Sequence, residues 1–218
     1  MKRNALIVCF GLVVCVLALP SCCLFESSKD TTVVSIKPPP PPEPPKPADL
    51  PYSKINFDYP LASLNSPRIF VYKNQRRLLL IQDETLIRDY PVGLGPSPTG
   101  DKCYRGDGRT PEGEFFICSK NPNSNYYKSF GISYPDAKRA KDALIAGTIS
   151  WNDYQNIVNT SSQHNTLPTW NTPLGGAIMI HGGGAYKDWT LGCIAVSNSI
   201  MDELFPVIPL GTPVKILP

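Results

Sequence analysis

Short runs of aliphatic, β-branched and aromatic residues, separated by polar turns, dominate the first half of the chain. Three such runs follow one another at residues 68–72, 77–82 and 85–92, and a fourth covers residues 114–118. This spacing predicts a meander of antiparallel strands. Residues 93–109 are rich in glycine and proline, which indicates a long loop of the kind that carries function.

Helical spacing appears in the middle of the chain. Residues 136–146 place alanine, lysine and leucine at helical intervals, with Asp136 as the N-cap and Gly147 as the C-cap. Residues 150–158 begin with a capping box and predict a second, short helix. Residues 159–173 are polar, and we expect them to form a loop near the active cleft.

Apolar runs return near the C-terminus. Residues 177–180 predict a buried strand that delivers His181 at its end, and residues 194–196 resemble a further strand. Residues 199–205 predict a helix capped by the serine or asparagine before it, and residues 214–217 a strand that closes the sheet. The pattern indicates a mainly β domain with a few helices (α+β), with its site at strand ends.

The N-terminus has the features of a targeting segment. Two cations at residues 2–3 precede an uncharged apolar run at residues 5–19, which is shorter than the roughly 20 residues of a membrane span. The run ends in Leu19-Pro20-Ser21-Cys22, which resembles the lipobox of bacterial lipoproteins with Cys22 as the lipidated residue. Cys23 is a competing acceptor, and an ordinary cleaved signal peptide is the alternative.

A proline-rich segment follows the targeting segment. Residues 38–42 are five consecutive prolines; extended polyproline at about 3.1 Å per residue would carry residues 38–51 over roughly 43 Å. The segment is expected to be a disordered spacer, and a docking site for a proline-binding partner is the alternative. We therefore divide the chain into a lipoprotein-type signal peptide (1–21), a lipidated N-terminus with a linker (22–51) and a catalytic domain (52–218).

Charge and cysteine content narrow the function. The formal net charge is +3 with dispersed lysines and arginines, which gives no support to nucleic-acid binding. We expect an exported, membrane-anchored protein that faces the periplasm, with its anchor in the outer membrane. Such a protein meets an oxidising compartment. Cys103, Cys118 and Cys193 remain in the domain, and an odd number suggests one pair and one free thiol. Cys103–Cys118 would close a loop worth roughly 3 kcal/mol; the alternative is that all three are reduced.

His181 and Cys193 lie twelve residues apart, and each is followed or preceded by glycine. A thiol becomes a strong nucleophile when an imidazole can take its proton, and glycine lets backbone N–H groups approach a reacting carbonyl. The only other histidine, His164, is a loop residue and a candidate for substrate contact. No second ligand pair has the spacing of a zinc site, so we expect neither a metal nor a cofactor.

The surroundings of this pair match a known signature. Met179-Ile180-His181-Gly182 with Thr190-Leu191-Gly192-Cys193-Ile194 resembles the His-Gly … Ser/Thr-x-Gly-Cys-Ile/Val signature of the L,D-transpeptidase (YkuD-type) catalytic domain. Residues 92–95, 106–113 and 129–135 resemble other stretches of that family. The resemblance implies a YkuD-like β-sandwich or mixed sheet with the catalytic cysteine loop at strand ends, in a lipoprotein-anchored member.

The resemblance also implies a chemistry. In the family, a cysteine attacks the L-centre carbonyl of meso-diaminopimelate in a peptidoglycan tetrapeptide stem and expels the terminal D-alanine. Cys193 would be this nucleophile, and His181 would accept and later donate the proton. A backbone carbonyl of Gly182 or Gly183 would orient the imidazole. The N–H of Gly192, with that of the cysteine itself, would stabilise the oxyanion, and one such donor is typically worth about 3 kcal/mol.

Other positions follow the family pattern less closely. Thr190 takes the Ser/Thr position and is expected to support the loop through a local hydrogen bond. Arg109 and Tyr134 would line the substrate cleft by analogy, and Trp189 would either contact substrate or pack beside it. Many members carry arginine two residues after the cysteine, where it would meet a substrate carboxylate, but this chain has Ala195.

Ala195 leaves the acceptor open. An amine acceptor would make the protein a cysteine-dependent L,D-transpeptidase that forms 3-3 cross-links or attaches a protein to peptidoglycan. Water would make it an L,D-endopeptidase or hydrolase that detaches wall-linked lipoprotein or trims stems. A wall-binding lipoprotein without turnover is the third reading. In each case the expected partners are peptidoglycan and, through the lipid anchor, a membrane.

Overall fold

The computed structural model describes residues 50–161 and 167–218. The predicted signal peptide, the lipidation site at Cys22 and most of the linker lie outside the described residues, as does His164. Within the described part, no helix is long and apolar enough to cross a membrane.

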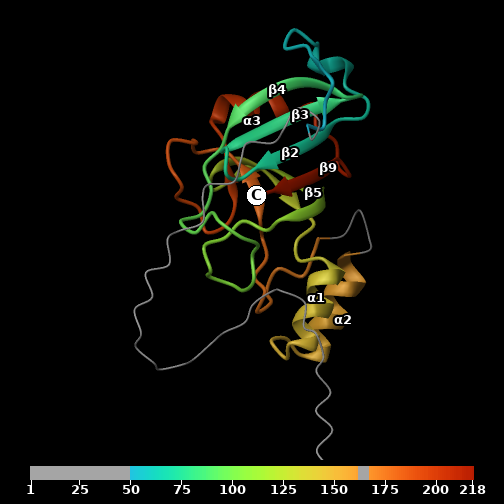
Figure 1. Ribbon diagram of the computed structural model, residues 1–218, viewed down its shortest axis with the longest axis vertical. Helices are drawn as coiled ribbons and strands as arrows, with labels where there is room; N and C mark the ends of the chain where they lie inside the picture. The colour runs from blue at the N-terminus through green and yellow to red at the C-terminus, as the bar shows by residue number, and fades with distance from the viewer. Residues whose placement is uncertain (1–49, 162–166) are drawn as a thin grey trace, which may run out of the picture. The chain divides into compact units, whose positions relative to one another are not determined.

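The described residues are built mainly of strands, which form one mixed sheet of nine strands in the order β1-β4-β3-β2-β9-β5-β6-β7-β8 (Figure 1). Three α-helices and a short 3₁₀ helix complete this part, so the predicted mainly β, α+β fold is confirmed. The elements are β1 (Lys54–Ile55), η2 (Leu61–Ser63), β2 (Arg68–Tyr72), β3 (Arg77–Gln82), β4 (Thr85–Pro91), β5 (Gly113–Ser124), β6 (Tyr127–Ile132), α1 (Ala137–Ile145), α2 (Trp151–Ser161), β7 (Met179–His181), β8 (Ile194–Ala195), α3 (Asn198–Leu204) and β9 (Pro213–Leu217).

The predicted meander is β2, β3 and β4. β2 pairs antiparallel with β3, with Phe70 opposite Leu79, and β3 pairs antiparallel with β4, with Leu79 opposite Asp89. β4 ends at Pro91, and the next residue, Val92, still donates its N–H to the Arg76 carbonyl oxygen at 2.9 Å. The long loop predicted after it is present.

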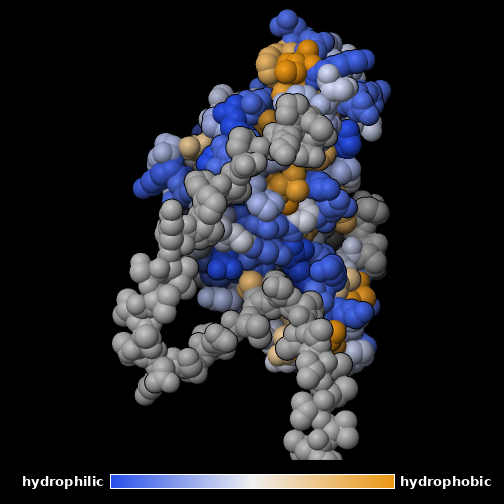
Figure 2. Space-filling model, in the orientation of Figure 1, coloured by the Kyte–Doolittle hydropathy of each residue, from blue (hydrophilic) through white to orange (hydrophobic). Residues whose placement is uncertain are grey.

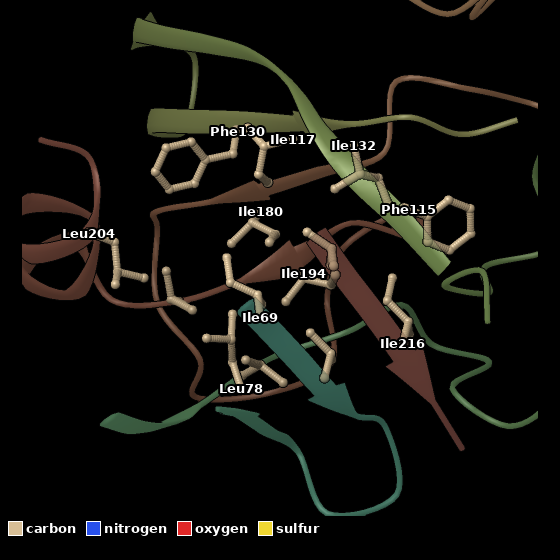
Figure 3. Close-up of a cluster of buried hydrophobic side chains, with 14 of the residues drawn as sticks. Ile69, Leu78, Phe115, Ile117, Phe130, Ile132, Ile180, Ile194, Leu204 and Ile216 are labelled. Carbon is tan, nitrogen blue, oxygen red and sulfur yellow. The ribbon is translucent and has the colours of Figure 1, made fainter. Parts of the chain in front are cut away.

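β9 lies inside the sheet, whereas the sequence predicted that it closes the sheet. It pairs parallel with β2, with Val71 opposite Ile216, and antiparallel with β5, with Phe115 opposite Val214. Alternate residues of these strands point into the main core, which Figure 3 shows as interleaved aliphatic and aromatic side chains. Burying the C-terminal strand on both edges ties the last residues of the chain to the centre of the domain.

β5 and β6 form a hairpin that the sequence analysis did not predict. β5 runs to Ser124, well beyond the predicted end, and Ser124 lies opposite Tyr127 at the hairpin tip. β6 then pairs antiparallel with β7, with Phe130 opposite Ile180 and Ser129 opposite His181. The hairpin therefore places its tip beside the end of β7.

The sheet folds back on itself. Gly93, just after β4, forms an antiparallel bridge with Ala195 of β8, with hydrogen bonds of 2.9 Å from Gly93 N–H and 2.8 Å from Ala195 N–H. The main core lies within this fold and draws side chains from most strands and from α3. The loop after β4 is thereby brought next to β8.

The helices form two groups. α1 and α2 lie side by side (Figure 1) and share a small cluster of their own with Ala140, Ile149 and Ile157 at its centre. Both predicted N-terminal caps are present: Asp136 accepts from Arg139 N–H at 2.8 Å, and the capping box at residues 150 and 153 is formed. α2 continues three residues past its predicted end. α3 begins one residue earlier than predicted and buries Met201 and Leu204.

Candidate active site

His181 and Cys193 are positioned by the parallel pairing of β7 with β8. Ile180 lies opposite Ile194, and His181 opposite Ala195; both isoleucines are fully buried in the core. Because successive side chains of a strand point to opposite faces, His181 and Cys193 share the other face. Cys193 is the residue before β8, so the two side chains are diagonal neighbours.

The His181 imidazole is held in one orientation. Its Nδ1 lies 2.6 Å from the carbonyl oxygen of Gly182, and a carbonyl can only accept a hydrogen bond. Nδ1 therefore carries the proton and Nε2 carries the lone pair, which is the tautomer of a general base. Burial lowers the pKa of His181 and outweighs the opposing effect of the Gly182 carbonyl, so the ring is neutral at neutral pH. Of the two predicted carbonyl acceptors, Gly182 is the one that the imidazole contacts, while Gly183 donates its N–H to Asn198 Oδ1 at 2.9 Å.

The Cys193 thiol is half-buried. Its Sγ accepts from the Met179 N–H at 3.4 Å and lies 3.6 Å from the Ala177 carbonyl oxygen. Burial raises the pKa of the Cys193 thiol, while the Met179 N–H and the positive charge of Lys102 act in the opposite direction. A base is therefore required to form the thiolate.

The Thr190 hydroxyl stabilises the loop that carries the thiol through hydrogen bonds to its backbone. Its side chain is buried, its hydroxyl donates to the Cys193 carbonyl oxygen at 2.7 Å, and it accepts from the Gly192 N–H at 3.2 Å. The predicted local hydrogen bond is thus present. The structure also gives the Gly192 N–H, predicted as an oxyanion donor, an acceptor within the protein.

Gly192 is required by its surroundings. Its φ is 121°, and a Cβ at this position would lie 2.6 Å from the carbonyl oxygen of Arg109. The main chain of Arg109 therefore packs against the loop, while its side chain donates to the Asp101 carbonyl oxygen at 3.3 Å. The structure brings Arg109 to the site through its backbone.

Asp188 fixes the same loop through hydrogen bonds. This role was not predicted from the sequence. The Asp188 carboxylate accepts hydrogen bonds from Arg76 Nη2 at 2.6 Å and Nε at 3.0 Å, and from the Leu94 N–H at 2.9 Å. Arg76 lies 112 residues away along the chain, so no local signal could have indicated the pair. The contact joins the catalytic loop to the turn between β2 and β3.

A second missed feature is the buried ion pair of Lys102 with Asp107, at 2.7 Å. Asp107 also accepts from the backbone N–H groups of Cys103, Tyr104 and Arg109. These bonds shape the loop between β4 and β5 and place a buried ammonium near enough to Cys193 to favour its thiolate. The Asp107 side chain is buried because this loop curls around it.

The remaining predicted site residues differ in placement. The Trp189 ring lies edge-on to His181, with centroids 5.5 Å apart, and its Nε1 donates to the Gly184 carbonyl oxygen at 3.0 Å. Tyr134 is fully buried, and its hydroxyl donates to the Leu174 carbonyl oxygen at 2.9 Å. The predicted substrate contact of Tyr134 is therefore wrong, because the ring packs beneath the surface.

The predicted disulfide between Cys103 and Cys118 is wrong. Cys118 is a free thiol, buried on β5, and its Sγ lies 3.3 Å from the carbonyl oxygen of Gly131. Cys103 is disulfide-bonded, but not to Cys118. The count of cysteines suggested a pair, but β5 turns Cys118 into the sheet, where it contacts β6.

The catalytic loop exposes large side chains at the surface. Leu191 and Tyr186 of the catalytic loop are 84% and 73% exposed, and Figure 2 shows a largely hydrophilic face interrupted by small apolar areas. Within residues 50–161 and 167–218, no three or more His, Cys, Asp or Glu side chains are grouped closely enough to hold a metal ion.

These features define a thiol–imidazole site at the ends of parallel strands, with the thiol in a glycine-containing loop. A family model described as the L,D-transpeptidase catalytic domain (YkuD) matches residues 66–216. The chain belongs to this family, as the sequence motifs indicated.

Solved structures similar to the chain include three from different bacteria. Bd1075 of Bdellovibrio bacteriovorus is 21% identical with a TM-score of 0.47, covering 77% of this chain and 53% of that one. The helical cell shape determining protein Pgp2 of Campylobacter jejuni is 20% identical with a TM-score of 0.46, covering 69% and 47%. The L,D-transpeptidase of Xylanimonas cellulosilytica is 17% identical with a TM-score of 0.41, covering 71% and 61%. The chain thus spans about half to three fifths of these proteins. No curated protein is significantly similar to it in sequence.

Proposed function

We propose that the protein is a peptidoglycan acyl-transfer enzyme that acts through a thioester on Cys193. The observation that carries the proposal is the hydrogen bond from His181 Nδ1 to the Gly182 carbonyl oxygen at 2.6 Å. It leaves Nε2 as the basic nitrogen on the face that Cys193 shares. The family model over residues 66–216 supports the same reading.

The acylation step uses the two side chains in turn. His181 Nε2 takes the thiol proton, and Sγ attacks the carbonyl carbon at the L-centre of meso-diaminopimelate in a tetrapeptide stem. The Cys193 N–H donates to the oxyanion, and the Gly192 N–H joins it when it leaves Thr190. The intermediate collapses, the imidazolium gives its proton to the departing amine, and D-alanine leaves.

The second step regenerates the thiol. An acceptor amine or water loses a proton to His181 and attacks the thioester carbonyl, and Cys193 departs as a thiol after the proton returns. An amine gives a 3-3 cross-link or a protein attachment, which is transpeptidation. Water gives hydrolysis, and Ala195 in place of the family's arginine keeps this second outcome open.

Muropeptides test the chemistry. The full chain is incubated with tetrapeptide-containing muropeptides, and the products are followed by mass spectrometry. We expect released D-alanine together with either cross-linked dimers or shortened stems, and the ratio of dimers to stems distinguishes the two outcomes. Cys193→Ala should abolish both, whereas Cys118→Ala, which removes the second free thiol of the described residues, should leave turnover unchanged. Wild-type protein that binds muropeptides without any product would establish the wall-binding alternative instead.

The residues before the domain support a tethered location. The Leu19-Pro20-Ser21-Cys22 segment and the proline-rich linker fit an exported lipoprotein that faces the periplasm, with its anchor in the outer membrane. Labelled palmitate should enter the wild-type chain and the Cys23→Ser variant but not Cys22→Ser. Fractionation that recovers the wild-type protein free in the periplasm would contradict this location.

A further inference from the structure

An aromatic side chain from the unpredicted hairpin covers the His181 ring. Tyr126, at the tip between β5 and β6, stacks on the imidazole with ring centroids 4.7 Å apart and an interplanar angle of 27°. Trp189 meets both rings edge-on, at 5.4 Å from Tyr126 and 5.5 Å from His181. The imidazole is thus enclosed by one ring from the hairpin and one from the catalytic loop.

Gly182 permits this approach. A Cβ at Gly182 would lie 3.0 Å from the Tyr126 carbonyl oxygen and 2.5 Å from Asn198 Oδ1. The hairpin tip and the start of α3 therefore press against the residue that also orients the imidazole. The Tyr126 N–H is held at 3.2 Å by the hydroxyl of Ser124, so the tip has a defined conformation.

The two stacked residues differ in how much of their surface is exposed to solvent. His181 is 2% exposed, while Tyr126 is 51% exposed. An exposed aromatic residue at a hairpin tip gains little from core packing, so its contact with the base is its main interaction. The Tyr126 hydroxyl has no hydrogen bond among the described residues, which leaves the ring as the part of the side chain that acts.

We propose that Tyr126 is a positioning residue for His181, whose ring fixes the imidazole plane and excludes water from one of its faces. The inference rests on the proposed function, because it gives a role to the base that function requires. Exclusion of water favours the neutral imidazole, and the lowered pKa of His181 has burial as its largest cause.

Charged groups on the neighbouring elements are occupied elsewhere. Lys128 of β6 pairs with Asp202 of α3 at 2.5 Å, and the Tyr127 hydroxyl donates to the same carboxylate at 2.7 Å. Just before β8, the facing titratable group is the Cys193 thiol, whose pKa is raised by burial. Solvation therefore controls the charge of the imidazole more than any neighbouring ion does.

Two effects of the stack on the His181 pKa oppose each other. Burial under the ring lowers it, whereas a cation–π contact between the ring and the imidazolium would raise it. Desolvation shifts of buried groups can reach about 3 units or more, so burial should dominate. Removal of the ring is then expected to raise the pKa.

Nuclear magnetic resonance of the full chain, labelled with ¹³C at histidine Cε1, measures this directly. The chain has two histidines, so the His164→Gln variant assigns the His181 signal. Tyr126→Ala should raise the pKa of His181 by half a unit or more, about a threefold change in proton affinity. Tyr126→Phe, which keeps the ring, should retain the wild-type pKa and the ring-current shift. Tyr104→Ala, which removes a 61% exposed tyrosine on another loop, is the matched control.

Kinetics supply a second readout. Tyr126→Ala should lower kcat about tenfold with KM unchanged, because the base is misplaced in the transition state while the substrate still binds. An unchanged or lowered His181 pKa in Tyr126→Ala, or a Tyr126→Phe variant that behaves like Tyr126→Ala, would overturn the inference. The titration needs no turnover, so a wild-type chain without activity refutes the proposed function separately.

Discussion

Thr190 offers a sharp test of how the catalytic loop is held. Its hydroxyl joins two backbone groups, the Cys193 carbonyl oxygen at 2.7 Å and the Gly192 N–H at 3.2 Å, while its own N–H donates to Leu94 at 3.0 Å. Thr190→Val keeps the shape of the side chain and removes only the hydroxyl. Thr190→Ser keeps the hydroxyl and removes only the methyl group, so it is the matched control.

The expected loss of stability follows from the two bonds. Each hydrogen bond contributes about 0.5–1.5 kcal/mol net, so Thr190→Val should lower the free energy of unfolding by about 2 kcal/mol. For a domain of this size, about 2–4 °C per kcal/mol gives a fall in Tm of roughly 4–8 °C. Thermal unfolding followed by circular dichroism measures it, and Thr190→Ser should stay within about 1 kcal/mol of wild type.

The same change should slow acylation of Cys193. Mass spectrometry can follow D-alanine release from tetrapeptide-containing muropeptides, and we expect it to be at least about tenfold slower in Thr190→Val, since small displacements of a nucleophile are costly. Wild-type Tm and rate would refute the reasoning. Faster acylation would also refute it, because it would show that release of the Gly192 N–H outweighs the support that the hydroxyl gives to the loop.

Three further changes test other parts of the structure. Lys73 is fully buried with three oxygen partners, so Lys73→Met should lower the free energy of unfolding, measured by denaturant titration, by about 3–5 kcal/mol. Lys138→Ala removes one partner of an exposed ion pair on a helix and should change that free energy by no more than about 0.5 kcal/mol. Burial acts to raise the pKa of Asp188, but the Arg76 side chain and the Leu94 N–H outweigh burial and hold the pKa below its usual value. The stability that the Asp188 carboxylate contributes is therefore complete above about pH 3.9 and is lost as the pH falls through the lower folded pKa. The Tm difference between wild type and Asp188→Asn should shrink on acidification. Burial raises the pKa of Cys118 to about 11, so brief alkylation at mildly alkaline pH, mapped by peptide mass spectrometry, should modify Cys193 first and Cys118 only after unfolding.

Local patterns predicted the elements whose determinants are local. The meander, the capped helices and the strand that ends at His181 depend on runs and caps that lie within a few residues. β6 was missed because Gly131 interrupts its apolar run, and it is stabilised by pairing with both β5 and β7. The central place of β9 rests on its parallel pairing with β2. The two strands are neighbours in the sheet but lie far apart along the sequence, so no local pattern encodes the pairing.

The site divides in the same way. His181 and Cys193 could be predicted because glycine and spacing mark them in the sequence. Tyr126 and Asp188 reach the site through contacts between segments that are distant along the chain, so their roles needed the hairpin and the β2–β3 turn to be placed first. The failed Cys103–Cys118 pair has the same cause, since the direction of a side chain depends on the strand that carries it.

Ala195 shows how the fold limits the chemistry at the acceptor side. It is fully buried, both of its backbone polar groups bond to Gly93, and it lies opposite His181. An arginine here would have to displace its neighbours or leave a charge buried without a partner, which is strongly unfavourable. The cation that acts on Cys193 in this chain is Lys102, which the Asp107 carboxylate already neutralises. Because no other cation among residues 50–161 and 167–218 acts on Cys193, we expect the proposed enzyme to select its acceptor less by charge than by access to the thioester.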